Sequence, residues 1–151
     1  MSGLDSLYQQ IILDHSKARH GSGLGGFMTP AGSNVGESHQ VNPTCGDEIT
    51  LRVAVADGTV EQICWDGDGC AISMASASVL SELGEGTDVA ELRVVIERFR
   101  ELLRSRGTIE PDEDVLGDAA AFAGVSKYPA RVKCAMLAWV AAEHALAEAI
   151  V

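Results

Sequence analysis

Residues 42–47, with the sequence Asn-Pro-Thr-Cys-Gly-Asp, constrain the fold more than any other segment of the chain. They place the thiol of Cys45 and the carboxylate of Asp47 close together among residues that favour turns. Two more cysteines, Cys70 and Cys134, lie far along the chain, and a suitable fold would bring them to the same point. Three thiolates and one carboxylate form a tetrahedral shell suited to zinc, which accepts both sulfur and oxygen ligands. The sequence therefore predicts a metal site that connects one loop with two distant segments.

The surroundings of each cysteine strengthen a signal that the long spacing alone leaves weak. Cys70 follows a glycine-rich turn and precedes a predicted helix, where free N–H groups and the helix dipole favour a thiolate. Arg131 precedes Cys134 by three positions, so its guanidinium would share a helix face with that thiolate and, with Lys133, offset negative charge. The alternatives are a Cys70 buried in a tight helix contact, an Asp47 that only caps a turn, and a solvated Arg131.

The remaining cysteine and two histidines have simpler interpretations. Cys64 lies inside an alternating strand pattern, which favours a small buried hydrophobic residue over a fourth thiolate ligand. His15 and His20 belong to the most basic run of the chain, residues 14–20. That run is either a docking patch for an acidic partner or, as we favour, a solvated helix end. The two histidines could be metal ligands, although single surface histidines are more common.

Composition limits the class of protein. The 151 residues, 46% hydrophobic and 22% charged, predict one domain over residues 1–151 with its own core. The net charge of −11 argues against nucleic acid or an anionic membrane as a partner. The N-terminus lacks the features of a secretion signal, and charged residues interrupt the most apolar stretch, 134–151. We therefore expect a cytoplasmic protein whose four cysteines are metal ligands or reactive thiols rather than disulfides.

Hydrophobic periodicity predicts the elements of the first half. A helix is expected over residues 4–15, and its buried face would comprise Leu4, Leu7, Tyr8, Ile11 and Ile12. Residues 21–41 are rich in glycine and are predicted to form an irregular loop. Alternation then predicts strands over 49–55 and 59–65, joined by a turn at Asp57 and Gly58, with a bulge in the second strand.

Turn and capping residues divide the second half into four helices. After a turn at 66–69, the first helix is predicted to run from near Cys70 to Gly84, and the second from an Asp88/Glu91 capping box to Gly107. A short third helix is expected from Pro111. The last helix would have Ser126 as its N-cap, Pro129 in its first turn and an end near Ala149. This order predicts an α+β fold, with a small antiparallel sheet of two or three strands and helices packed on one face.

The predicted site suggests chemistry at sulfur. Four protein ligands fill a zinc shell, as in structural sites, but a reaction at a ligand sulfur needs no open position. Cys45 lies on the most deformable segment, so it would leave the metal at the least cost. Its freed thiolate could then attack a persulfide and remove the outer sulfur. Cys70 and Cys134, on helices, suit retention of the metal.

Three ordered motifs, at residues 42–47, 67–78 and 129–134, resemble the SufU branch of the IscU/NifU-like superfamily, and the similarity extends over essentially the whole chain. The resemblance implies an IscU/NifU-like fold and a zinc-dependent sulfurtransferase. Such a protein accepts persulfide sulfur from a pyridoxal-phosphate cysteine desulfurase of the SufS type and supplies downstream iron–sulfur assembly proteins. The implied zinc ligands are Cys45, Asp47, Cys70 and Cys134, and the implied catalytic residues are Arg131 and Cys45, which accepts sulfur after a partner histidine displaces it from zinc.

Two other functions remain as alternatives. The first is a scaffold on which a [2Fe-2S] cluster is assembled, which bound iron with labile sulfide would favour. Against it, Lys133 stands where scaffolds carry a histidine, the stretch between Cys70 and Cys134 is longer, and the scaffold's proline-rich chaperone-binding motif is absent before Cys134. The second alternative is a non-catalytic zinc module, which would bind a desulfurase without changing its turnover.

Overall fold

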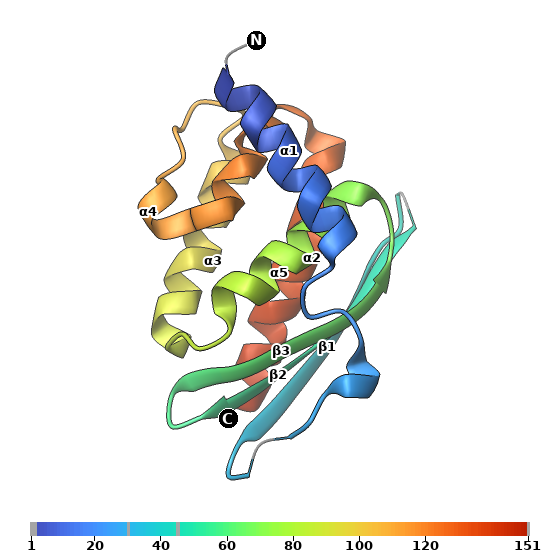
Figure 1. The fold of residues 1–151 in the computed structure, drawn as a ribbon, viewed down its shortest axis with the longest axis vertical. Coiled ribbons are helices and arrows are strands. Elements are labelled where there is room, and N and C mark those ends of the chain that lie inside the picture. The colour runs from blue at the N-terminus through green and yellow to red at the C-terminus, as the bar shows by residue number, and fades with distance from the viewer. Residues whose placement is uncertain (1–2, 30, 45, 151) are drawn as a thin grey trace.

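A computed structural model describes residues 3–29, 31–44 and 46–150, which fold into a three-stranded antiparallel sheet covered by helices (Figure 1). The elements in chain order are α1 (Gly3–Ala18), the 3-10 helix η1 (Leu24–Gly26), β1 (Asn34–Asn42), β2 (Asp47–Ala56), β3 (Thr59–Asp68), α2 (Ala71–Gly84), α3 (Val89–Arg104), α4 (Glu113–Leu116), the 3-10 helix η2 (Gly117–Lys127) and α5 (Pro129–Ala149). The predicted α+β class is confirmed.

The hairpin β2–β3 forms as predicted. Asp57 and Gly58 both have positive φ, 52° and 76°, as a two-residue type I′ turn requires. Ala54 pairs with Gln62 whereas Val55 pairs with Val60, so one extra residue of β3 forms the expected bulge. The bulge changes the side-chain parity of β3 and keeps apolar residues on the helix-covered face on both sides of it.

The prediction of an irregular loop over 21–41 is wrong for its second part. Residues 34–42 form β1, which pairs with β2 along its whole length, from Asn34 opposite Val55 to Asn42 opposite Asp47. The strand was missed because it lies at the sheet edge and buries little: only Gly36 and Asn42 are buried in it. Asn42 ends β1 and Asp47 begins β2, so the segment predicted as a loop connects the two strands of a second hairpin.

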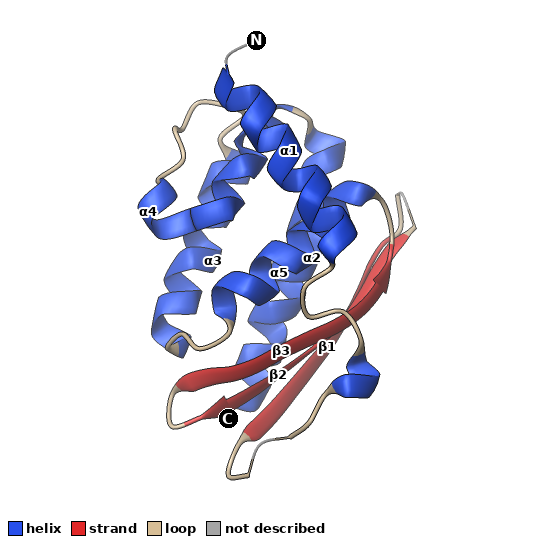
Figure 2. Ribbon diagram, viewed as in Figure 1, coloured by secondary structure: helices blue, strands red, loops and turns tan. Residues whose placement is uncertain are grey.

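Helices cover one face of the sheet, as Figure 2 shows, and α5 packs directly on β1 and β2. Alanines dominate the buried face of α5, including Ala138, Ala141 and Ala145, and their small side chains permit close approach to the strands. At Gly36 a Cβ atom would lie 1.8 Å from the carbonyl oxygen of Ala145. This glycine is therefore needed for close strand–helix packing, not for backbone freedom.

Several predicted boundaries shift. Residues 66–68 continue β3 instead of turning, and α2 begins after Cys70 as expected. Asp88 occupies the N-cap of α3 without a side-chain capping bond, so the predicted capping box does not form. Ser126 is not the N-cap of the last helix; that position is Tyr128, because η2 continues through Lys127 and Pro129 then starts α5.

Helix α1 spans more than predicted, and its buried face is narrower. Tyr8 is buried, Ile11 and Ile12 are half-buried, and Leu7 is exposed, while the side chain of Leu4 lies outside the described part. The reason is that α1 covers the outside of α2 and η2 rather than the sheet. None of the helices in the described part of the chain is both long and apolar enough to cross a membrane.

Candidate metal centre

Three predicted ligands from three elements meet at one end of the sheet. Asp47 is the first residue of β2, Cys70 is the N-cap of α2, and Cys134 lies in the second turn of α5. One ligand atom of each lies within 4.8 Å of the others. We call these three residues the cysteine cluster. The fold thus brings together side chains that the sequence separates widely, as the metal-site prediction required.

Asp47 is the member of the cysteine cluster whose side chain is fixed by burial and by hydrogen bonds to both carboxylate oxygens. Its carboxylate is almost fully buried, and both oxygens accept hydrogen bonds. The amide N–H of Cys70 donates to Oδ1 at 3.1 Å, and the hydroxyl of Ser73 donates to Oδ2 at 2.5 Å. Gly69 packs against the same carboxylate, since a Cβ atom there would lie 2.7 Å from Oδ1. The sequence analysis missed Ser73, although its position one helical turn after Cys70 could have indicated it.

The two cysteines differ in their exposure. Cys70 is exposed, and its thiol lies 3.6 Å from Oδ2 of Asp47. Cys134 is buried, and its thiol lies 3.7 Å from the carbonyl oxygen of Ala130. The N-terminus of α2 therefore presents one sulfur to solvent, while α5 presents the other from inside. Of the two alternatives for Cys70, the structure excludes burial in a tight helix contact.

The donor set fits a divalent metal ion. Two sulfurs that share a zinc ion at about 2.3 Å each can be at most about 4.6 Å apart. The ligand atoms of the cysteine cluster all lie within 4.8 Å of one another, so one ion could contact all three after small side-chain adjustments. Deprotonation of both thiols would place three negative charges in this volume, which is unfavourable unless a cation offsets them. Two thiolates and one carboxylate are ligands that zinc accepts. Cys45, the fourth predicted ligand, lies outside the described residues.

The residues on either side of Cys45 close the turn between β1 and β2. The N–H of Gly46 donates to the carbonyl oxygen of Asn42 at 2.8 Å, and the N–H of Thr44 donates to the Asn42 side chain at 3.2 Å. Gly46 has φ 77°, a conformation that favours glycine. Lys133 lines a small groove beside this turn together with Pro43 and Thr44. A cation therefore lies near the turn that precedes Asp47.

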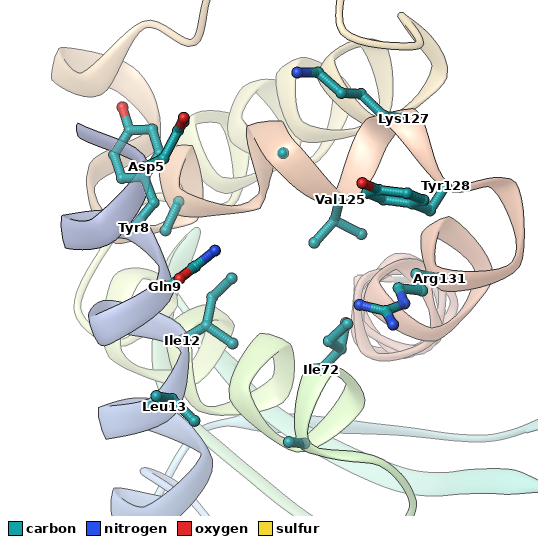
Figure 3. A pocket seen from close by; sticks show the side chains of 13 residues that line it. Asp5, Tyr8, Gln9, Ile12, Leu13, Ile72, Val125, Lys127, Tyr128 and Arg131 are labelled. Carbon is teal, nitrogen blue, oxygen red and sulfur yellow. The ribbon is translucent and has the colours of Figure 1, made fainter. Parts of the chain in front are cut away.

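Arg131 lines a pocket next to the N-terminus of α2. Its guanidinium is 5.6 Å from the centre of the Tyr128 ring, and both residues line a cavity of about 550 Å³ between α1, α2, η2 and α5 (Figure 3). Ile72 and Ala71 line the same cavity, and Ala71 directly follows Cys70. The pocket thus adjoins the N-terminus of α2.

Cys64 is buried in β3, as predicted for a small hydrophobic residue, and takes no part in the cysteine cluster. The side-chain amide of Gln62 donates to its sulfur at 3.3 Å. Burial raises the pKa of the Cys64 thiol, so it is protonated at neutral pH. The preference for a structural cysteine over a fourth thiolate ligand is consistent with this environment.

His15, His20 and Glu82 form a second group whose ligand atoms lie within 4.8 Å of one another; we call it the histidine cluster. His15 is buried, and both of its ring nitrogens are engaged: Nδ1 lies 2.8 Å from the Ser78 hydroxyl and Nε2 lies 2.9 Å from Asp118. A ring nitrogen must offer a lone pair to bind a metal. The histidine cluster is therefore best explained as a hydrogen-bond network that joins α1 to α2 and η2.

Comparison with known proteins identifies the family to which this chain belongs. The chain matches the family described as the NifU-like N terminal domain over residues 7–148. It is 37% identical over 148 residues to the zinc-dependent sulfurtransferase SufU of Bacillus subtilis strain 168, covering 97% of this chain and 94% of that protein. It is also 37% identical over 148 residues to the iron–sulfur cluster assembly scaffold protein IscU of Streptococcus pyogenes serotype M1, covering 97% and 86%.

A solved structure extends the comparison. The crystal structure of a putative iron–sulfur cluster assembly scaffold protein for the SUF system, from Fervidobacterium islandicum AW-1, superimposes with a TM-score of 0.72 at 32% identity, covering 95% of this chain and 99% of that chain. The three sequence motifs, the α+β fold and the family match over residues 7–148 all indicate the same family. The chain belongs to the NifU-like N-terminal domain family.

Proposed function

We propose that this chain is a zinc-dependent sulfurtransferase that accepts persulfide sulfur from a cysteine desulfurase for iron–sulfur cluster assembly. The observation that carries the proposal is the convergence of Asp47, Cys70 and Cys134 from three elements at the turn that contains Cys45 in sequence. The sulfurtransferase SufU of B. subtilis, to which the chain is similar over nearly its whole length, supports this reaction class.

The proposed site uses four ligands: Cys45, Asp47, Cys70 and Cys134. Bound zinc would keep the coordinated thiols deprotonated at neutral pH. The thiolate of Cys45 attacks the outer sulfur of the partner's persulfide. The sulfur–sulfur bond of the donor breaks, its electron pair leaves with the desulfurase thiolate, and a new persulfide forms on Cys45 without net oxidation. Arg131 is proposed to offset the negative charge of this exchange from its position at the adjoining pocket.

The partner in this proposal is a pyridoxal-phosphate cysteine desulfurase of the SufS type, and the sulfur passes on to downstream iron–sulfur assembly proteins. We further propose that the chain is one domain and works in the cytoplasm. The family match over residues 7–148 supports a single domain. Transfer requires direct contact of the donor persulfide with the end of the sheet that carries the cysteine cluster.

The decisive test measures sulfur transfer to variants in which one cysteine is replaced by alanine. Cys45→Ala should abolish uptake of labelled sulfur from cysteine in the presence of the desulfurase, because the proposed acceptor is removed and Cys70 and Cys134 would remain bound to zinc. Cys64→Ala is the matched control and should transfer sulfur normally, since Cys64 lies apart from the cysteine cluster. A Cys45→Ala protein that still takes up sulfur and still accelerates the desulfurase would refute the proposal.

A cluster scaffold is the second candidate, because the relatives include proteins named as IscU scaffolds at equal identity. The two candidates differ in what the purified protein should contain. Anaerobic purification followed by metal and acid-labile sulfide analysis should give zinc near one equivalent without iron for a sulfurtransferase. Matching iron and sulfide would make the scaffold function primary. A zinc module that binds the desulfurase without changing its turnover would represent the third possibility.

A further inference from the structure

Asp47, a proposed ligand of the metal centre, accepts hydrogen bonds at both carboxylate oxygens, and these bonds bear on the order in which ligands could be exchanged. Carboxylate oxygen is a harder donor than thiolate sulfur and is the weaker partner for zinc in a sulfur-rich shell. An incoming donor would therefore be expected to displace Asp47 first and leave all thiolates bound. Sulfur transfer requires the opposite order, in which a thiolate is released while the carboxylate stays.

The structure supplies a restraint on Asp47 that acts against its displacement. Ser73 is buried on α2, and its hydroxyl lies 2.5 Å from Oδ2 of Asp47 and 3.3 Å from the carbonyl oxygen of Cys134. The Cys70 amide holds Oδ1. Each carboxylate oxygen has two lone-pair directions, so a metal can bind Asp47 without displacing either hydrogen-bond donor. Hydrogen bonds to a buried, ionised carboxylate are stronger than those between neutral groups.

The backbone around Asp47 adds to this restraint. The residue opens β2, pairs with Asn42 across the sheet, and packs against Gly69. Ser73 lies one helical turn after Cys70, so α2 supplies both a proposed ligand and the group that orients the next one. The carboxylate is thus held in place before any metal arrives. Rotation of the Asp47 side chain away from the metal would break both hydrogen bonds and leave the buried Ser73 hydroxyl with only its longer contact to the Cys134 carbonyl oxygen, which is unfavourable.

We propose that Ser73 is a positioning residue that, with the Cys70 amide, keeps Asp47 on the metal so that ligand exchange falls on a cysteine. This inference rests on the proposed function, because the release of a cysteine ligand from the metal is useful for sulfur transfer. Its test does not require the desulfurase, so failure of sulfur transfer and failure of the positioning role are distinguishable.

The test follows thiolate ligands in the cobalt-substituted protein. The sulfur-to-cobalt charge-transfer absorption scales with the number of bound thiolates, and free imidazole serves as the incoming donor. In the wild type, saturation with imidazole should lower this absorption by about a third, the share of one thiolate in three. In Ser73→Ala the absorption should persist, because Asp47 is displaced instead. Ser73→Thr keeps a hydroxyl and should behave like the wild type.

Ser76→Ala is the matched control. Ser76 is a buried serine on the same helix whose hydroxyl bonds the Ala135 carbonyl oxygen and accepts from Trp139 Nε1. This variant should show the wild-type loss of absorption. Equal losses in Ser73→Ala and wild type would overturn the proposal. The wild-type titration is decisive even if Ser73→Ala does not fold, because imidazole binding with all thiolates retained would also overturn it.

Discussion

The cysteine cluster and the histidine cluster look alike by distance alone, since each gathers three ligand atoms within 4.8 Å. They differ in how the ligand atoms are used. In the cysteine cluster the hydrogen bonds converge on Asp47, and the nearby thiols can exchange their hydrogens for a metal ion. In the histidine cluster both ring nitrogens of His15 already bind Ser78 and Asp118. Proximity is therefore not sufficient for a metal site; the ligand atoms must also be available.

The largest expected effect is on zinc affinity, which should depend on the cysteine cluster and not on the histidine cluster. Asp47→Ala removes a proposed ligand, so zinc affinity should fall by at least about 100-fold, the upper range seen when only a supporting residue is lost. Glu82→Ala in the histidine cluster should leave the affinity unchanged. Competition with a chromophoric chelator measures both values. Unchanged affinity in Asp47→Ala would contradict its assignment as a ligand.

The second prediction concerns stability. His15→Ala should lower the free energy of unfolding by about 1–3 kcal/mol, because Ser78 and Asp118 lose their shared partner in a buried network. Its zinc affinity should not change. His39 is the matched control, because its exposed side chain contacts the exposed carboxylate of Glu48 on the sheet. His39→Ala should change the free energy of unfolding by less than about 0.5 kcal/mol. Urea unfolding of the zinc-loaded proteins tests this, and a loss of zinc in His15→Ala would refute the structural interpretation.

The smallest effect concerns thiol reactivity outside the cysteine cluster. Burial raises the pKa of Cys64, so its thiolate is scarce at neutral pH and becomes more abundant as the pH rises. In zinc-free protein, iodoacetamide should therefore label Cys64 more slowly than the exposed Cys70, and its rate should increase from pH 7 to pH 9. Mass spectrometry of timed samples measures both rates. Equally fast labelling of the two cysteines at pH 7 would contradict this prediction.

Local patterns predicted the elements that bury a regular face or carry a specific turn. The hairpin β2–β3 follows from alternation and from Asp57-Gly58, and α2, α3 and α5 begin and end near the expected residues. Edge strand β1 was missed because pairing on one side and a glycine packed on α5 leave no hydrophobic alternation to detect. Ser126 failed as an N-cap because η2 continues through that position. The first error arose where a tertiary contact replaced a local preference, and the second where a neighbouring 3-10 helix occupied the expected capping position.

The donor chemistry of the site is readable from the amino-acid sequence, which shows which residues carry thiols and carboxylates and which turns and helix starts present them. Which of these residues meet depends on how the helices and strands pack. Asp47, Cys70 and Cys134 converge because β2, α2 and α5 pack at one end of the sheet, while Arg131 faces the pocket beside Tyr128. The role of Ser73 likewise depends on a contact between α2 and β2. Such contacts join residues far apart in the chain, and short-range periodicity contains no information about them.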